Sequence, residues 1–355
     1  METVYVGLSG GVDSSVSAAL LKEQGYNVVG VYMKNWTQDL PGMPCPWKED
    51  FADAKRVAVQ LGIDFKVYDF EKQYFDKVVK YMLDGFKAGF TPNPDIMCNR
   101  EIKFGVFRQV AQQRGFDAVA TGHYVRRMDH ADGTSDILEG LDDNKDQSYF
   151  LALVRQEQLR QALFPLGELK KNQVRQMAME KGFSNASKKD SQGICFLGKV
   201  RIGDFLKEFI EDQPGDIVNV DGRVVGQHKG LHRFTIGQRK GIGVPSNADD
   251  EHYVVVAKDF DANRLVVAFE KPLSPHLYTE RVQIRDVHFI NRPITQRANL
   301  LAKPRYRDPS TPIVFEPLKD GHADVAFQHP QRALARGQVL ALYDGPVLLG
   351  GGFYC

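Results

Sequence analysis

Short apolar runs alternate with amphipathic stretches along the N-terminal third of the chain. The runs with the length and the β-branched or aromatic content of buried strands are Val4–Leu8, Asn27–Met33, Phe65–Tyr68 and Ala118–Thr121. The segments with apolar residues at helical spacing are Ser14–Gln24, Phe51–Leu61, Tyr74–Phe86 and Lys103–Arg114. Gly25 and Gly62 mark where two of these helices are expected to end. This order predicts an α/β fold, a doubly wound parallel sheet.

The pattern changes towards the C-terminus. Gln147–Phe183 is typical of a helix-rich segment, whereas after about Pro214 short apolar runs are separated by Gly, Asp and Asn turns. One turn, Asp221-Gly222, is a hairpin signal. The expected strands are Asp216–Val220, Tyr253–Ala257, Leu265–Ala268, Val282–Val287, Ala298–Lys303, Ile313–Phe315, Ala323–Phe327 and Gln338–Tyr343. Their spacing favours a small, mostly β domain and then a C-terminal β-barrel, with a sandwich as the alternative. The domains expected are 1–207, 208–272 and 273–355.

Composition indicates an ordinary globular protein, with 43% hydrophobic and 26% charged residues in 355. No apolar run approaches the ~18 residues that a membrane span requires, and a strand pattern already begins at Val4. We therefore expect a cytoplasmic protein without a leader. Its four cysteines form no C-x-x-C pair, so no metal site is predicted. The net charge of +1 does not indicate nucleic-acid binding, although residues 222–248 contain basic but no acidic side chains until Asp249.

The string Ser9-Gly10-Gly11-Val12-Asp13-Ser14-Ser15 lies between the first expected strand and the first expected helix. Its glycines allow successive N–H groups to face an anion at a helix N-terminus. Asp13 would be unusual in a purely anion-binding loop, but it fits if Mg²⁺ or a backbone N–H needs an acceptor. The string is neither a Walker A loop nor G-x-G-x-x-G. An ordinary capped turn is the alternative, which the complete string disfavours.

A first cysteine follows two prolines, Pro92 and Pro94. We expect these prolines to prevent a helix before Asp95, so that a helix begins near Asn99 and Cys98 lies at its N-terminus. The helix dipole would lower the pKa of the Cys98 thiol there. Asp95 would lie close enough for proton transfer if the turn folds back. The alternative is a half-buried cysteine with a capping aspartate.

A second cysteine, Cys195, follows a polar stretch that includes Lys188 and Lys189. Gly193 and Gly198 flank it and suggest a mobile loop that could carry a thiol into a site. The apolar residues immediately around Cys195 are equally typical of a short core strand. The local sequence leaves both interpretations open.

The phosphate-loop string resembles that of the PP-loop ATP pyrophosphatases, which activate a carbonyl oxygen by adenylation. The resemblance implies that ATP binds with Mg²⁺ at this loop. The implied nucleotide-binding residues are Gly7, Leu8, Ser9, Gly10, Gly11, Val12, Asp13, Ser14, Ser15, Met33 and Gly122. Gly122 follows a strand at the carboxyl edge of the sheet, where ligands bind in open α/β folds.

Further strings resemble the bacterial tRNA-specific 2-thiouridylases along the whole chain. They are MKNW at residues 33–36, NPDIMCNREIKF at 93–104, ATGHY at 120–124, DQSYFL at 146–151, DSQGICF at 190–196 and GGGFY at 350–354. The resemblance implies that Cys98 is the nucleophile, that Cys195 carries persulfide sulfur from a cysteine desulfurase or relay protein, and that the two can form a disulfide. Asp95 would be the general acid or base.

By the same resemblance, the substrate is the wobble uridine of a tRNA anticodon loop. The implied tRNA contacts are Asn93, Pro94, Asp95, His123, Lys145, Asp146, Gln147, Arg305, Tyr306 and Gln338. Arg305-Tyr306 offers a charge and a stacking ring, as single-stranded RNA requires. The alternatives are a PP-loop amidating synthetase acting on a small acid, and a non-catalytic RNA-binding protein. The paired cysteines and the intact Asp13 favour the thiouridylase hypothesis over both.

Overall fold

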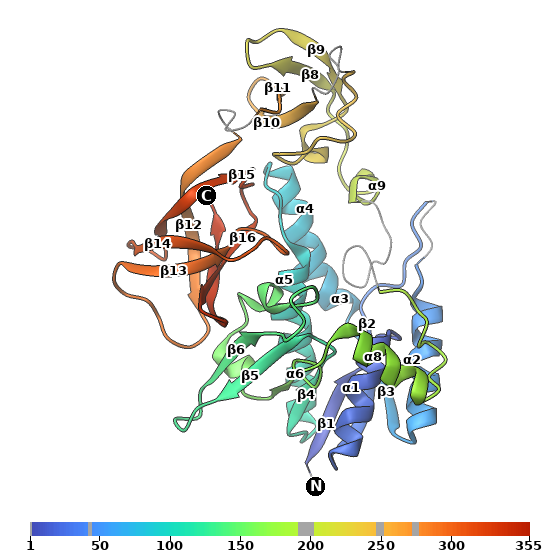
Figure 1. Cartoon of the computed structure of the whole chain (residues 1–355). Helices are drawn as coiled ribbons and strands as arrows, with labels where there is room; N and C mark the ends of the chain where they lie inside the picture. The colour runs from blue at the N-terminus through green and yellow to red at the C-terminus, as the bar shows by residue number, and fades with distance from the viewer. Residues whose placement is uncertain (1, 42–44, 191–201, 246–251, 272–276) are drawn as a thin grey trace.

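The computed structural model describes residues 2–41, 45–190, 202–245, 252–271 and 277–355. Its N-terminal part is a parallel sheet with the strand order β3-β2-β1-β4-β7 (Figure 1). The strands are β1 (Thr3–Gly7), β2 (Asn27–Lys34), β3 (Asp64–Asp69), β4 (Ala118–Ala120) and β7 (Ala162–Leu163). This arrangement confirms the predicted α/β sheet.

Both faces of the central strand β1 are buried, which explains why its sequence is apolar without interruption. Val4 and Val6 pack with residues of α1 and α2, such as Ala18 and Ala54, on one face. Tyr5 packs on the other face, in the core cluster that also contains Phe107. A parallel strand covered by helices on both sides needs a continuous hydrophobic run rather than an alternating one.

The helical segments of the described chain are α1 (Val12–Glu23), α2 (Trp47–Leu61), α3 (Glu71–Tyr74), η1 (Phe75–Val79), α4 (Lys80–Lys87), α5 (Pro94–Cys98), η2 (Asn99–Val106), α6 (Phe107–Gln113), η3 (Ser148–Leu151), α7 (Gln156–Leu159), α8 (Lys171–Glu180), α9 (Ile202–Lys207) and η4 (Leu231–Arg233). The π-helical turns η1 and η2 join the α-helices on either side of them. α2 ends at Gly62 in the left-handed conformation, as predicted, with φ +59° and ψ +44°.

The predicted start of the helix around Cys98 is wrong. The helix begins at Pro94, and the side chain of Asn93 caps it by accepting a hydrogen bond from the N–H of Ile96 at 3.2 Å. Proline restricts the residue that precedes it and is itself favoured at the first helical position, where its missing N–H costs nothing. Cys98 therefore lies at the end of α5, beyond the first turn.

The predicted helix-rich segment Gln147–Phe183 contains η3, α7 and α8. Two strands that the sequence pattern did not predict lie between Thr121 and Gln147. β5 (Val125–Asp129) and β6 (Ser135–Glu139) form an antiparallel hairpin there. β6 pairs with β17 through Leu138 and Val347, more than two hundred residues further along the chain. The polar and charged residues in this hairpin hide the strand pattern, and the pairing depends on a partner that the local sequence does not contain.

The small β domain is a sheet with the order β10-β11-β8-β9. Its strands are β8 (Gly215–Asn219), β9 (Val224–His228), β10 (Tyr253–Asp259) and β11 (Arg264–Phe269). β8 and β9 are antiparallel neighbours, and Gly222 between them has φ +81°. The predicted Asp221-Gly222 hairpin is thus confirmed.

The C-terminal part is a closed antiparallel barrel, which decides the predicted choice between barrel and sandwich. Neighbouring strands follow the order β12-β15-β14-β13-β16-β17, and β17 pairs with β12 to close the ring. Their bounds are β12 (Tyr278–Phe289), β13 (Ala298–Lys303), β14 (Thr311–Pro317), β15 (Ala323–Arg332), β16 (Val339–Asp344) and β17 (Val347–Tyr354). Closure leaves no unpaired edge around the ring.

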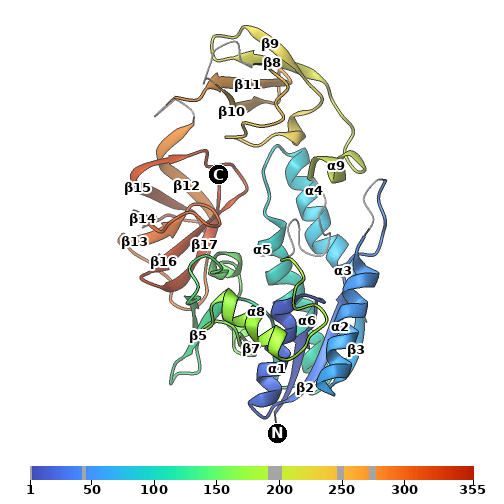
Figure 2. The same cartoon turned by 45° about the vertical axis from the view of Figure 1, so that its right-hand side comes forward.

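One hydrophobic cluster joins the α/β part to the barrel. Tyr5 and Cys98 from the N-terminal part belong to the same buried cluster as Val339, Tyr343 and Phe353 from the barrel. Figure 2 shows the barrel beside the β5 hairpin and α5. No helix in the described parts of the chain is both long and apolar enough to cross a membrane.

Candidate active site

The phosphate-loop string connects the end of β1 to the start of α1. Gly10 has φ +77°, and a Cβ atom there would lie 2.3 Å from the backbone oxygen of Asp50. The loop is braced from within, because the hydroxyls of Ser14 and Ser15 donate to the Gly11 carbonyl at 3.1 and 2.9 Å. Glycine at the N-cap position offers no side chain to the N–H groups of the first turn, which suits them to an anion.

Gly122 and Met33 lie against this loop, as expected for the carboxyl edge of the sheet. A Cβ atom on Gly122 would be 2.9 Å from the backbone nitrogen of Ser14, so only glycine permits this approach. The methyl group of Met33 would lie 3.0 Å from a Cβ atom on Gly7, and Met33 itself is 5% exposed. The fold thus gathers the nucleotide residues expected from the sequence into one place.

Asp13 is the centre of a charged network that the sequence did not indicate. Lys171 at the start of α8 donates to both carboxylate oxygens of Asp13, at 2.6 and 2.8 Å. The hydroxyl of Tyr124 donates to one of them at 2.7 Å. Burial and the neighbouring Asp13 carboxylate raise the pKa of Tyr124, so its hydroxyl stays protonated and remains a donor.

The network extends to Asp190, the first residue of the DSQGICF string. Lys171 and Arg175 each lie 2.8 Å from one of its oxygens, and Lys145 lies 2.6 Å from the other. Burial would raise the pKa of Asp190, but the hydrogen bonds from Lys145 and Lys171 outweigh this effect and lower it to about 2. Lys171 is therefore held between a phosphate-loop carboxylate and Asp190.

Asn185 contacts the loop directly, whereas Lys188 holds the neighbouring helix α2. Asn185 donates to the backbone oxygen of Gly10 at 2.9 Å and to the hydroxyl of Ser15 at 3.0 Å. Lys188 forms ion pairs with Asp50 and Asp53 of α2 at 2.8 and 2.6 Å. The local sequence does not indicate these contacts or those of Lys171, because an isolated Lys or Asn in a polar stretch is typical of a solvated surface.

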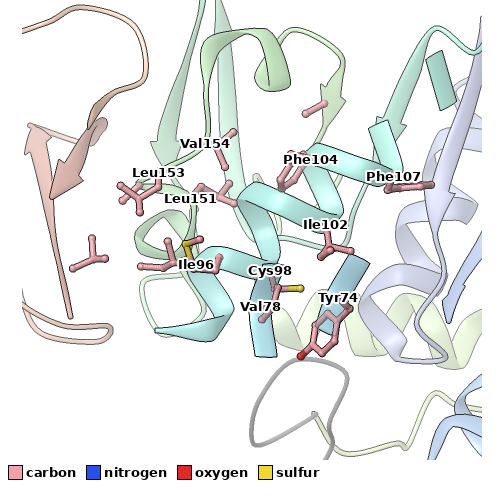
Figure 3. Packing of buried hydrophobic residues seen from close by; sticks show 14 of the residues in the cluster. Tyr74, Val78, Ile96, Cys98, Ile102, Phe104, Phe107, Leu151, Leu153 and Val154 are labelled. Atoms are coloured by element: carbon pink, nitrogen blue, oxygen red, sulfur yellow. The ribbon is translucent and has the colours of Figure 1, made fainter. Parts of the chain in front are cut away.

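Cys98 is fully buried in the structure. It lies among hydrophobic side chains, beside Tyr74 and Val78 of the preceding helical segment (Figure 3). Asp95, which lies one turn earlier on α5, is partly exposed. A reaction at the Cys98 sulfur therefore needs a change of conformation that exposes it. Cys195 lies outside the described residues, so its distance from Cys98 stays open.

Comparisons with known proteins agree on one family. Family models match residues 2–199 ("tRNA methyl transferase HUP domain"), 203–269 ("tRNA methyl transferase PRC-barrel domain") and 279–353 ("Aminomethyltransferase beta-barrel domain"). The tRNA-specific 2-thiouridylase MnmA of Akkermansia muciniphila is 51% identical over 356 residues, which cover 100% of this chain and 99% of that protein. The chain belongs to the tRNA-specific 2-thiouridylase family.

Other relatives agree with this family assignment. The tRNA-specific 2-thiouridylase MnmA of Pseudomonas savastanoi pv. phaseolicola is 46% identical, with 99% of this chain and 94% of that protein covered. Among solved structures, a 4-thiouridine synthetase in complex with RNA and ATP aligns over 56% of this chain and 46% of that chain. Its TM-score of 0.36 and 20% sequence identity are too low to support any conclusion about this thiouridylase family member.

The tRNA contacts expected for this family fall into an accessible and an inaccessible group. Arg305, whose side chain is 37% exposed and pairs with Asp308 at 2.9 Å, is available to a ligand. Tyr306 lies with its ring 4.3 Å from that of Phe150, and it is partly exposed. Gln338 donates to the backbone oxygen of Thr91 at 2.8 Å and so connects the barrel to the segment before α5.

The inaccessible group consists of His123 and Asp146. The imidazole of His123 is 6% exposed and bonds to the Thr121 hydroxyl at 2.7 Å, and burial lowers its pKa well below the usual value. The carboxylate of Asp146 accepts from the Ser148 hydroxyl and the Lys303 ammonium, both at 2.8 Å. In this conformation both residues position other groups, and neither can reach an RNA molecule.

Proposed function

We propose that this family member adenylates the C2 oxygen of the wobble uridine of a tRNA with ATP and replaces that oxygen with sulfur. The proposal is supported chiefly by the 51% identity to a tRNA-specific 2-thiouridylase over the full chain. It is supported independently by the phosphate loop, whose two glycines and first-turn N–H groups suit the phosphates of ATP.

Asp13 is the residue that would hold Mg²⁺ together with ATP. A magnesium ion usually binds through one or two carboxylates plus phosphate oxygens and water, and a single carboxylate at the helix N-terminus fits that pattern. Bound there, Mg²⁺ would offset the charge of the phosphates. Lys171 and Tyr124 already use three of the roughly four lone-pair sites of the Asp13 carboxylate, so Mg²⁺ would take the remaining site or displace one of these contacts.

The sulfur step is assigned to the two cysteines. The C2 oxygen attacks the α-phosphorus, and pyrophosphate leaves. The terminal sulfur of a persulfide on Cys195 then attacks C2, and AMP leaves with the former oxygen. The Cys98 thiolate attacks the inner sulfur of Cys195, which breaks the persulfide bond, leaves 2-thiouridine and forms a Cys98–Cys195 disulfide. A thiol reductant then restores both cysteines, and Asp95 takes or gives the required protons.

Methyl transfer, which the family-model descriptions mention, is the reaction to distinguish from thiolation. A methyl group from a donor does not require ATP or a phosphate loop, whereas replacing oxygen with sulfur requires that the oxygen be activated. The mass of the modified nucleoside separates an added methyl group from an exchanged oxygen. An amidating synthetase would instead consume ATP with a small acid and without tRNA, and the family assignment disfavours it.

Sulfur incorporation into unmodified tRNA tests the proposal. The reaction contains ATP, Mg²⁺, cysteine and a cysteine desulfurase, and the product is digested and analysed by mass spectrometry. We expect thiouridine from the wild type and none from Cys98→Ser or Cys195→Ser. The matched control is Cys45→Ser, which removes a half-buried thiol outside both motifs and should keep its activity. An inactive wild type, or full activity of Cys195→Ser with the desulfurase, contradicts the proposed mechanism.

A further inference from the structure

A cavity of about 390 Å³ lies between α4 and the barrel. Tyr81 comes from α4, Phe90 from the segment that follows it, and Arg100 from η2. The opposite wall consists of Arg285 on β12 and Phe353 on β17. Its volume lies within the range of ~300–1,000 Å³ that is typical of small-molecule sites, and none of the nucleotide residues described above lines it.

The lining of this cavity has the chemistry of a nucleobase site. The guanidinium of Arg285 lies 5.5 Å from the ring centre of Phe353 and 5.9 Å from that of Phe90. The guanidinium of Arg336 lies 5.1 Å from the Phe90 ring. Aromatic rings and arginine planes are the surfaces on which proteins stack the unpaired bases of RNA loops. The carboxylate of Asp286 accepts a hydrogen bond from Arg285 and restricts its guanidinium.

Asp286 itself has an unusual backbone. Its φ of +52° lies in the left-handed region, which non-glycine residues seldom adopt. Such conformations cost free energy and occur preferentially where a ligand is bound. Here the conformation coincides with a register shift in the pairing of β12 with β17 between Arg285 and His288. This bulge places Arg285 and Asp286 at the cavity.

The cavity also adjoins the residues expected to contact the target base. Tyr81 lies close to the backbone of Asn93, the first of those residues, and that backbone opposes the rise that burial causes in the pKa of Tyr81. Gly337 in the cavity wall directly precedes Gln338, whose side chain donates to the backbone oxygens of Thr91 and Pro92 at 2.8 and 3.3 Å. A nucleotide in the cavity would therefore be a close neighbour of one held at Asn93.

Neither Cys98 nor the phosphate loop lines the cavity in this conformation, so the reacting uridine is assigned to a different place. Met97 lines the cavity, whereas Cys98 lies beside Tyr74 and Val78 (Figure 3). Consecutive residues of an α-helix point in directions ~100° apart, so the two side chains serve different sides of α5. A base that reacts at Cys98 and at the phosphate loop lies outside this cavity.

We propose that this cavity binds an anticodon-loop base that flanks the target uridine, stacked on the surface formed by the Arg285 guanidinium and the rings of Phe90 and Phe353. The inference rests on the proposed tRNA function and deepens it. Holding a neighbouring base would keep the uridine turned out of the loop, because the unstacking of the strand is then stabilised at a second point.

Binding of anticodon stem-loop RNAs tests this inference. We would use fluorescence anisotropy with a set of RNAs in which each loop nucleotide in turn lacks its base but keeps its sugar and phosphate. The proteins are wild type, Arg285→Ala, Phe90→Leu and the matched control Arg281→Ala, an exposed arginine on the same strand. Thermal unfolding and ATP binding of each variant check that the fold and the phosphate loop are intact.

We expect that one abasic position flanking the uridine weakens wild-type binding about tenfold, as for one stacked base. Arg285→Ala and Phe90→Leu should weaken binding of the intact RNA by a similar factor. These two variants should bind the same abasic RNA as tightly as they bind the intact RNA, because their stacking interaction with the missing base is already lost. Arg281→Ala should keep the full response to base removal.

Two results would overturn the inference while leaving the proposed function in place. In the first, wild type binds and thiolates tRNA, but the loss of RNA affinity caused by each pocket variant adds to the loss caused by every base removal. In the second, the pocket variants weaken ATP binding and leave RNA binding unchanged, which would assign the cavity to the nucleotide. If the wild type binds no RNA, the proposed function and this inference both fail.

Discussion

The contact between Lys171 and Asp13 offers the most direct test of how the phosphate loop is organised. The change Lys171→Met keeps much of the side-chain length but removes the ammonium that lies between Asp13 and Asp190. Two carboxylates would then share a site without the cation between them. The side chain of Lys171 is 11% exposed, whereas those of Asp13 and Asp190 are 32% and 34% exposed.

The magnitude follows from this partial burial. Removing one partner of a fully buried ion pair costs about 3–5 kcal/mol, whereas an exposed pair contributes about 0–1 kcal/mol. Since both carboxylates are about one third exposed, we expect a loss of roughly 2 kcal/mol in the free energy of unfolding. With about 2.1 cal/mol/K of unfolding entropy per residue, the Tm of a chain of 355 residues shifts by about 1.3 °C per kcal/mol, so the Tm should fall by roughly 3 °C.

The functional effect should be larger than the effect on stability. Without Lys171, the negative charge of Asp13 faces the phosphates of ATP unopposed, so ATP binding measured by calorimetry without Mg²⁺ should weaken at least tenfold, on the order of 1.4 kcal/mol. Mg²⁺ should restore part of this loss by neutralising Asp13. The matched control is Lys170→Met, which removes the same charge from the neighbouring exposed residue. Unchanged ATP affinity in Lys171→Met, or an equal loss in Lys170→Met, would refute the reasoning.

Three further predictions concern the loop, the charged network and the cysteine helix. Gly10→Ala should abolish measurable ATP binding, because its Cβ would meet the Asp50 oxygen at 2.3 Å, whereas Gly25→Ala, with a similar φ of +89° and open space around it, should only lower the Tm slightly. Because the pKa of Asp190 is lowered to about 2 from ~3.9, its contribution to stability is complete above about pH 4 and is lost as the pH falls through 2. In denaturant titrations the advantage of wild type over Asp190→Asn should therefore vanish towards pH 2, and an advantage that persists there would argue against the ion-pair explanation. Asn93→Ala should cost about 1 kcal/mol in unfolding experiments through loss of the cap on α5, and Asn93→Ser should recover most of it.

The local sequence was sufficient where an element depends on its own residues. The interiors of strands β1 and β2 are apolar because both of their faces are covered. The left-handed glycine after α2 ends that helix through its own backbone conformation. The seven-residue phosphate loop was equally clear, since a Gly-Gly turn between a strand and a helix constrains the backbone directly.

The start of α5 shows a limit of local reasoning. Pro94 could be interpreted as a barrier to a helix or as its first residue, and the two readings differ by one turn. The Asn93 side chain caps the helix, so the helix begins at Pro94. Cys98 therefore lies beyond the first turn, in a buried position, and not at the helix N-terminus as predicted. The predicted lowering of the pKa of the Cys98 thiol by the helix dipole therefore has no geometric support.

Sequence alone thus determined the α/β sheet, the phosphate loop and the resemblance to a thiouridylase, because short motifs and periodic apolar runs carry that information. Tertiary structure decided that Lys171 bridges Asp13 and Asp190, that β6 pairs with β17, and that β17 closes the barrel on β12. These contacts join residues that are distant in the chain, and each depends on the placement of both partners by the folded core. A charged residue in a polar stretch has the same local signature whether it remains in water or reaches a buried partner.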